Sequence, residues 1–394
     1  MKQLIFSLYL FMLFGCHKAD IQSTKSIGIA VPWNDSSGNH PKNIAFKTLL
    51  EKYRLKGLPG ISLLVNDAKG TWVGATGKAD IGNNIDFVPG TVSKAASITK
   101  LFMGVLIFKL FEDSVNSRLG YRSLQMPIST WLPGRITSKI ANGTQVTLGQ
   151  LLSHQSGIPD LIDEDDFYLA VLNNPNKKWE QEELLSFIYN KSPLFTPADT
   201  AIYSNTNTIL VSLIMEYATG TKHEDLLRQL ILSPLTLYDT YYQSHDILPN
   251  SVAQGYFDLY NNNTLVNVSN LITGSGNGYG GLFSNLFDLY KFADLLFIKQ
   301  ILLKPVSLAI MQTYGKQDDT NLYGYGLQKS FLTRGIDAGI GHKGRDLGYT
   351  ANLLYFPNKK VLHIFFVNYG TDSDSDLKNV FREFQEELVS LSLQ

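Results

Sequence analysis

The chain has 394 residues, of which 44% are hydrophobic, and it carries 34 basic against 35 acidic side chains. That length can bury a large core, in one big domain or in two interleaved ones. The near-zero net charge argues against a nucleic-acid partner, because nucleic-acid-binding surfaces concentrate basic residues. The single cysteine excludes an internal disulfide and any zinc site built from several cysteines.

The N-terminus predicts an export signal with a lipid attachment site. Lys2 precedes a short apolar run over residues 4–14, which is too short to cross a bilayer as a mature helix. The run ends in Leu13-Phe14-Gly15-Cys16, a pattern typical of bacterial lipoproteins; the alternative is an ordinary secretory signal with an incidental cysteine. We therefore expect residues 1–15 to be a signal peptide, Cys16 to carry lipid and residues 16–42 to form a tether. The protein would then be lipid-anchored in the bacterial cell envelope, facing the periplasm or the exterior.

The first part of the folded chain predicts a helix followed by two strands and a second helix. Residues 43–56 carry apolar side chains at helical spacing, which predicts an amphipathic helix. Its expected apolar stripe consists of Ile44, Leu49, Leu50 and Tyr53. Two strands are predicted over residues 60–65 and 71–75, and they are joined by a turn. The second helix begins at Ser97, where apolar residues again recur at helical spacing.

The remainder of the chain returns to strands near its end. The three late strands are predicted over residues 340–344, 351–356 and 361–367, before a closing helix over 377–391. Together with the two early strands, they predict an α+β fold, in which one antiparallel sheet of about five strands comes from both chain ends and is flanked by helices. Residues 43–111 and 271–394 would form this sheet domain, and residues 112–270 a mainly helical inserted region of the same unit.

The segment Ser97-Ile98-Thr99-Lys100 places a hydroxyl and an amine one turn apart at the start of a helix. Both side chains share one helix face, and the positive helix end favours developing negative charge. An amine among apolar neighbours loses part of its preference for the charged form. We therefore expect Ser97 to be a nucleophile and Lys100 its proton acceptor or electrostatic partner; the alternatives are a helix N-cap and a surface lysine. The same pattern at Ser375 to Lys378 lies in an acidic stretch and is better interpreted as a helix cap.

Tyr203-Ser204-Asn205 brings a phenol and an amide close together. Tyr203 would share the proton with Lys100, because a phenol beside an amine can ionise below its usual pKa. Asn205, two residues on in an extended loop, would reach the same side and hold the substrate amide or the lysine. A core tyrosine and a helix cap are the alternatives for these two residues.

Several further segments surround these motifs in a particular order. They are Phe87-Val-Pro-Gly-Thr91, Thr147-Leu-Gly-Gln-Leu-Leu-Ser-His-Gln-Ser-Gly157, Phe195-Thr-Pro197, Pro234-Leu-Thr-Leu-Tyr-Asp-Thr240, Gly280-Gly-Leu-Phe-Ser284, Tyr323-Gly-Tyr-Gly-Leu327 and His342-Lys343-Gly344. Over about residues 41–390 this order resembles the serine beta-lactamase and D-alanyl-D-alanine carboxypeptidase family, in its class C-like branch that also contains esterases and D-amino-acid peptidases. The resemblance implies a beta-lactamase/transpeptidase-like layout, with the site in the cleft between the sheet domain and the helical region.

The resemblance also implies roles for the last motif. His342 stands where the true beta-lactamases carry lysine, and it would position the substrate; the alternative is a satisfied strand histidine. Gly344 would let the acyl group lie close against the strand, and the N–H groups of Ser97 and Arg345 would form an oxyanion hole. Lys343 replaces the serine or threonine whose hydroxyl helps many relatives to bind a carboxylate. In a regular strand, Lys343 should point away from His342.

Other combinations of residues are weaker signals. Asp163-Glu-Asp-Asp166 groups carboxylates without a glycine turn, which is typical of a solvated loop rather than a metal site. His154 is interpreted as structural, because no Gly-x-Ser-x-Gly elbow accompanies it. The sequence therefore predicts neither a metal nor a cofactor.

Two functions remain open at this stage. The first is a serine acyl hydrolase that forms an acyl-enzyme on Ser97 with a small-molecule or peptide substrate, such as a small ester, a D-amino-acid peptide or a beta-lactam. The second is a catalytically inactive, surface-anchored lipoprotein of the same fold that binds a ligand or the cell wall. The joint presence of a nucleophile, an amine, a phenol and an amide favours the first.

Overall fold

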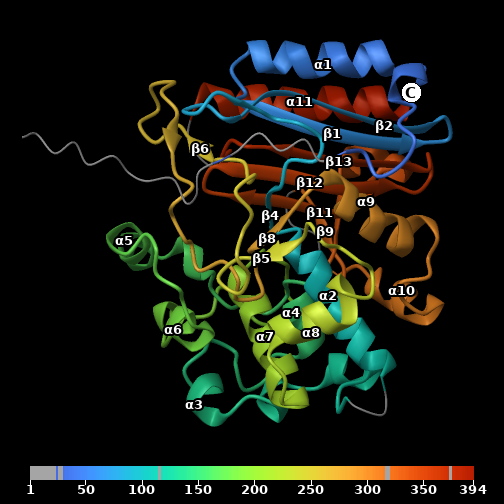
Figure 1. Cartoon of the computed structure of the whole chain (residues 1–394). Coiled ribbons are helices and arrows are strands. Elements are labelled where there is room, and N and C mark those ends of the chain that lie inside the picture. Colours follow the sequence, from blue (N-terminus) through green and yellow to red (C-terminus); the bar gives the residue numbers. More distant parts are fainter. Residues whose placement is uncertain (1–23, 25–29, 114–116, 316–319, 372–374) are drawn as a thin grey trace, which may run out of the picture.

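The computed structural model describes residues 24, 30–113, 117–315, 320–371 and 375–394 (Figure 1). The predicted signal peptide and Cys16 lie outside these residues, as does most of the predicted tether. Within the described ranges, no helix combines the length and the apolar character needed to cross a membrane.

One large antiparallel sheet organises the fold, and it draws its strands from both chain ends. Its order is β3 (Ile85–Asp86), β2 (Gly70–Asp80), β1 (Gly60–Asp67), β13 (Val361–Val367), β12 (Tyr349–Phe356), β11 (Gly339–Asp346), β10 (Gln328–Ser330) and β9 (Leu322–Tyr323). The N-terminal and C-terminal parts meet at the β1–β13 pair, where Ile61 lies opposite Val367. The predicted α+β class is confirmed. The five predicted strands form the centre of the sheet, and three short strands extend it at its two ends.

Two helices from opposite ends of the chain cover one face of this sheet. They are α1 (Asn43–Leu55) and α11 (Asp376–Leu393), which lie side by side in Figure 1. The alternation of β1 supplies their partners, because Ile61, Leu63 and Val65 all face this layer. The predicted stripe of α1 is wrong at Ile44, which is 79% exposed; Phe46 is buried in its place. Ser375 caps α11 as predicted, and its hydroxyl accepts from the N–H of Leu377.

The opposite face of the sheet lies over a larger core that surrounds α2 (Thr99–Glu112). Nearly every side chain of α2 is buried, because α7 (Asn205–Thr219), α8 (His223–Leu227) and α10 (Pro305–Met311) pack around it. In Figure 1 these helices lie below the sheet, on the side away from α1 and α11. The further helices are α3 (Gly134–Thr137), α4 (Leu148–Leu152), α5 (Asp165–Asn173), α6 (Gln181–Leu185), α7 (Asn205–Thr219), α8 (His223–Leu227), α9 (Leu286–Ala293) and α10 (Pro305–Met311).

A small second sheet leads into α2. It consists of β4 (Ser93–Ala96), β8 (Leu282–Ser284) and β5 (Tyr241–Tyr242), with β8 in the middle. A two-stranded ribbon of β6 (Tyr256–Phe257) and β7 (Val266–Asn267) lies apart from it. Because β4 is followed directly by α2, this small sheet sets the position at which the first turn of α2 begins.

Candidate active site

Ser97 lies at the junction between β4 and α2. The preceding residue, Ala96, adopts a left-handed conformation with φ of +49°, which is uncommon for a residue with a side chain. Ser97 O then accepts from the N–H of Lys100 at 2.9 Å, which closes the first helical turn. Thr99 fixes the junction, because its hydroxyl donates to Ala96 O at 2.7 Å and accepts from Leu282 N at 3.1 Å. Such local strain is held by surrounding bonds and is common at active sites.

The amine of Lys100 is buried in the core, and the side chain is only 2% exposed. Its Nζ lies 3.2 Å from Ser97 Oγ, and it donates to Asn205 Oδ1 and to Tyr279 O, both at 2.6 Å. Burial lowers the pKa of Lys100 to about 7, although the nearby carboxylates of Asp160 and Asp346 act in the opposite direction. A substantial fraction of this amine is therefore neutral near pH 7.

Asn205 connects Lys100 to a buried carboxylate that the sequence analysis did not identify. The amide nitrogen of Asn205 donates to Asp160 Oδ2 at 2.8 Å, while its oxygen accepts from Lys100. Burial raises the pKa of Asp160 to about 6. Asn205 is the first residue of α7 rather than part of an extended loop, so this expectation was wrong. Asp160 follows a loop without a motif of its own, and the sequence therefore carries no signal for its role.

Tyr203 lies beside the same amine. The Lys100 Nζ is 4.8 Å from the centre of the Tyr203 ring. His154 also packs against this ring, with 4.5 Å between the centroids, and Tyr323 and His342 lie near it. The structure thus brings Ser97, Lys100, Tyr203 and Asn205 together, as the sequence predicted, although they come from segments about a hundred residues apart.

His154 has the geometry of a structural residue. Its Nδ1 accepts from the backbone N–H of Ser204 at 3.2 Å and lies 3.3 Å from Asn207 Nδ2. Burial, together with the charge of Lys100, lowers the pKa of His154 to about 3. A neutral imidazole at this position holds the segment that carries Tyr203 in place.

The two side chains at the start of the last motif are arranged differently from the expectation. His342 is 1% exposed, and its Nδ1 contacts the carbonyl of Lys343 at 2.6 Å. Burial and the positive charge of Lys100 hold the pKa of His342 well below its ordinary value, so the ring is neutral. Lys343 lines the cavity at Ser97, which is described below, whereas His342 does not. The alternation of β11 therefore turns His342 toward Tyr203 and puts Lys343 at the position expected for His342.

Gly344 has a structural reason of its own. A Cβ at this position would lie 2.1 Å from the carbonyl oxygen of Ala95 in β4. The backbone that leads to Ser97 therefore approaches Gly344 closely, and the expected contact of Gly344 with the acyl group stays a prediction. This packing fixes β11 against β4, the strand that leads to Ser97.

A cavity of about 310 Å³ opens above Ser97. Tyr203, Asn205 and Arg345 line it together with Lys343. The pairing of β10 with β11 ends at Gly341. The part of β11 that follows Gly341 borders the cavity. Asp346 also borders the cavity, and its carboxylate is 2.7 Å from the buried amine of Lys94. No sequence motif indicated Lys94 and Asp346, although this ion pair holds the end of β11 against β4.

The chain is similar to several known proteins. It is 27% identical to unguisins hydrolase ungD of Aspergillus violaceofuscus over 58% of its length, but the match spans only 39% of that protein. It is 25% identical to penicillin-binding protein 4* of Bacillus subtilis, over 84% of this chain and 71% of that protein.

Two solved structures have a fold similar to that of this chain. A D-stereospecific amidohydrolase from Streptomyces sp. superposes with a TM-score of 0.72 at 25% identity, over 83% of this chain and 94% of that one. The fold of the D-amino acid amidase from Ochrobactrum anthropi SV3 matches with a TM-score of 0.74 at 23% identity, over 89% and 97% of the two chains. The model of the beta-lactamase family matches residues 46–385. The chain therefore belongs to the beta-lactamase family and is a serine hydrolase of that fold.

Proposed function

We propose that this protein hydrolyses esters or amides through an acyl-enzyme on Ser97. The observation that carries this proposal is the environment of Lys100, whose amine has three neighbours and a lowered pKa. A neutral amine has two N–H groups and one lone pair. The carbonyls of Asn205 and Tyr279 take the two N–H groups, which leaves the lone pair for the hydroxyl of Ser97.

The reaction follows from this arrangement. Ser97 Oγ attacks the acyl carbon of the substrate while its proton moves to Lys100 Nζ, and the carbonyl oxygen gains negative charge. The N–H groups of Ser97 and Arg345 stabilise that charge. The tetrahedral intermediate then expels the leaving group, which takes the proton from Lys100, with Tyr203 beside the amine. Water, activated by the same groups, releases the acid and restores Ser97.

The proposed substrates are small acyl compounds with an amide or ester bond. Several similar proteins are named for their action on amino-acid derivatives, among them a D-amino acid amidase and the D-alanyl-D-alanine-carboxypeptidase/endopeptidase AmpH of Escherichia coli, which is 26% identical. The cavity of about 310 Å³ is near the lower end of the range for ligand sites, about 300–1,000 Å³. We therefore place small esters and short D-amino-acid amides ahead of bulkier substrates.

We also propose that lipid on Cys16 anchors the protein to a membrane outside the cytoplasm. The support is the sequence Leu13-Phe14-Gly15-Cys16 after a charged start and a short apolar run. Metabolic labelling with a palmitate analogue should mark the wild type and leave Cys16→Ser unmarked. Unlabelled wild-type protein in the soluble periplasmic fraction would contradict the anchor.

Substitution of the nucleophile tests the catalytic proposal. Ser97→Ala should abolish turnover and covalent labelling by a fluorescent phosphonate, and its far-UV circular dichroism should match the wild type. Ser375→Ala is the matched control, because it alters the same Ser-x-x-Lys pattern in a helix cap and should keep turnover near that of the wild type. Full turnover in a folded Ser97→Ala protein would overturn the assignment. A wild type that binds ligands but never labels or turns over would support the inactive lipoprotein instead.

A further inference from the structure

Two histidines and a carboxylate converge outside the cavity of Ser97. His223 and Glu224 begin α8, and His245 follows the short strand β5. One possible ligand atom from each of these three residues lies within 4.8 Å of those of the other two. His223 is buried, Glu224 is partly exposed and His245 is exposed. Sequence spacing gave no signal for this cluster, since 20 residues separate Glu224 from His245 in the chain and the turn after β5 brings them together.

The orientation of the His245 ring is fixed by the backbone. Its Nε2 lies 2.8 Å from the carbonyl oxygen of Gly276, so this nitrogen carries the hydrogen and donates it. In the neutral ring the lone pair is then on Nδ1, which faces Glu224 Oε1 at 3.4 Å. Either a proton on Nδ1, as in an ion pair of His245 with Glu224, or a bound metal ion removes the repulsion between that lone pair and the carboxylate. A second ring nitrogen bound to a backbone carbonyl is also the usual arrangement of metal-binding histidines.

His223 presents its own Nδ1 to the same carboxylate. This atom lies 3.1 Å from Glu224 Oε2, and the Nε2 of the ring is 3.3 Å from the Gly276 carbonyl that also holds His245. Two ligand atoms on a tetrahedral zinc ion with bonds of 2.0–2.1 Å lie about 3.3 Å apart. The two nitrogen–oxygen separations, 3.1 Å to Oε2 and 3.4 Å to Oε1 of Glu224, are close to this value. One ligand atom from each of the three residues lies within 4.8 Å of the others, so side-chain movements would bring the three groups onto one ion.

A second carboxylate completes the surroundings. Glu216 Oε1 is 2.6 Å from His223 Nδ1, and its other oxygen is 3.0 Å from Lys222 Nζ. A separation of 2.6 Å is too short for two ligands of one zinc ion. Binding of an ion to His223 Nδ1 would displace the proton that Glu216 accepts, and the freed Glu216 oxygen could then turn to the ion as a fourth ligand.

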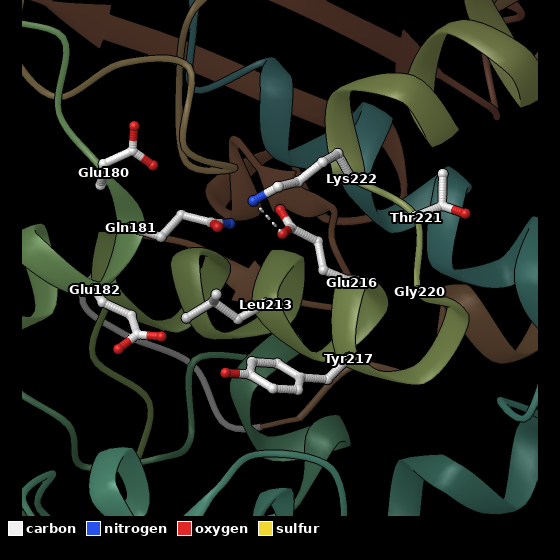
Figure 2. A pocket seen from close by; sticks show the side chains of 9 residues that line it. All are labelled: Glu180, Gln181, Glu182, Leu213, Glu216, Tyr217, Gly220, Thr221 and Lys222. Carbon is white, nitrogen blue, oxygen red and sulfur yellow. Dashed lines mark ion pairs between the residues drawn. The ribbon is translucent and has the colours of Figure 1, made fainter.

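An acidic pocket leads to this cluster. Figure 2 shows a pocket of about 480 Å³, into which Glu216 and Lys222 project toward each other. Glu180 and Glu182 also line it, so three of its nine lining residues carry carboxylates. Gln181 belongs to the same lining, and its Nε2 is 3.4 Å from His223 Nδ1. His223 therefore lies directly behind the pocket wall, next to Glu216 and Gln181.

We propose that His223 Nδ1, His245 Nδ1 and Glu224 bind one zinc ion, with Glu216 as the fourth ligand. Two imidazole nitrogens favour zinc over calcium or magnesium, which prefer oxygen ligands alone. The ion would brace the segment that supports the active site. Gly276 O holds both rings, Gly278 N donates to Tyr242 OH at 2.8 Å, and Tyr279 O accepts from Lys100. The site is therefore structural and does not touch the substrate.

Direct measurement of zinc binding tests this proposal independently of hydrolysis. The full chain is stripped with a chelator, dialysed and titrated with zinc chloride, with calorimetry and elemental analysis as readouts. We expect one equivalent of zinc in the wild type and a loss of affinity of roughly 100-fold or more in His245→Ala, at least as large as the loss for an outer-shell partner. Cobalt should give the intense visible bands of a tetrahedral site in the wild type, and these bands should be lost in the variant.

Two control variants separate this site from weaker cation binding. His40→Ala removes a histidine that also faces a carboxylate, since its Nε2 lies 3.2 Å from Asp67 Oδ1. Asp165→Asn with Asp166→Asn removes two charges from the acidic stretch at the start of α5. Both should retain one equivalent of zinc. If His245→Ala does not fold, Glu224→Gln keeps the shape of the side chain and replaces it in the comparison. A wild type that takes up no zinc, or a Glu224→Gln variant with unchanged affinity, would overturn the proposal.

Discussion

Lys100 concentrates the chemistry of the site in a single side chain. Burial of a charged amine is costly, and the two carbonyls that accept its N–H groups do not carry a full negative charge. The buried carboxylate of Asp160 is linked to the amine through the amide of Asn205. This separation explains why the pKa of Lys100 falls to about 7 instead of being held high by an ion pair. The fold therefore tolerates an unfavourable burial in order to hold a base.

We predict that kcat/KM for a neutral nitrophenyl ester rises with pH and levels off above a midpoint near 7. The pKa of Lys100 is lowered to about 7, so the amine is protonated and inactive below that pH and neutral above it. Asp160→Asn should shift the midpoint to lower pH, because the Asp160 carboxylate raises the pKa of Lys100. Asp86→Asn, which alters an exposed ion pair with Lys78, should leave the midpoint unchanged. A midpoint that rises in Asp160→Asn would contradict this account.

We predict that Lys100 and Tyr203 act as one proton-handling unit. Lys100→Met and Tyr203→Phe should each slow acylation by about 10²-fold or more, because each removes part of the base. The double variant should be little slower than the worse single variant, as expected for residues that work together. Rapid-mixing measurements of the acylation phase give the three rates, with Tyr260→Phe as an exposed control. Multiplicative losses in the double variant would argue against the unit.

The residues that sequence could identify are those whose side chains carry the chemistry. Ser97, Lys100, Tyr203 and Asn205 lie in motifs with fixed spacing, and the structure brings them together. Tyr279 contributes a backbone carbonyl, which every residue possesses, so its role leaves no trace in the sequence. Strand alternation predicted that Lys343 points away from His342, as the structure has it. Which of the two side chains lines the cavity was beyond the sequence, because an alternation assigns faces only once one position is fixed.

At the scale of elements, the site depends on the contact between β11 and β4. We predict that Gly344→Ala lowers the free energy of unfolding by about 1–3 kcal/mol, the usual cost of overpacking, and also reduces kcat/KM. The added Cβ would lie 2.1 Å from Ala95 O, two residues before Ser97, so that one of the two strands must shift. Urea denaturation and ester hydrolysis measure the two effects. Gly134→Ala is the control, because a Cβ there meets nothing within 4 Å, and it should change neither quantity appreciably.

The elements with a strong periodic signal were predictable, and the short ones were not. The clearest signal among the central strands is the nearly continuous apolar run of β13 (Val361–Val367). The strands β3 and β9 contain two residues each and β10 three, which is too short for a period to be recognised. In α1, Phe46 rather than Ile44 faces the sheet, because the strands beneath determine which side of the helix is buried.

The whole molecule assembles its site from distant parts of the chain. Ser97 comes from the N-terminal part, Tyr203 from the middle and β11 from the C-terminal part, and the β1–β13 pair joins the two ends of the sheet. Hydrolysis should therefore be lost in the same cooperative transition as the fold, since no single segment contains the site. The large sheet and the α2 core serve to hold these three segments in register.

The choice of substrate depends on the whole cavity. Activated short-chain esters should turn over faster than cephalosporins. An ester needs only Ser97, Lys100 and the oxyanion donors, and it fits a cavity of about 310 Å³. A cephalosporin is bulkier, and Lys343 lines the cavity in place of the serine or threonine hydroxyl that the family resemblance implies, so a contact that a polar site requires for discrimination is lost. The values of kcat/KM for nitrophenyl butyrate and a chromogenic cephalosporin decide the order. Lys343→Thr, which places a hydroxyl in the cavity wall, should raise cephalosporin acylation more than ester cleavage. A cephalosporin value above the ester value in the wild type would reverse this order and assign the cavity to beta-lactams.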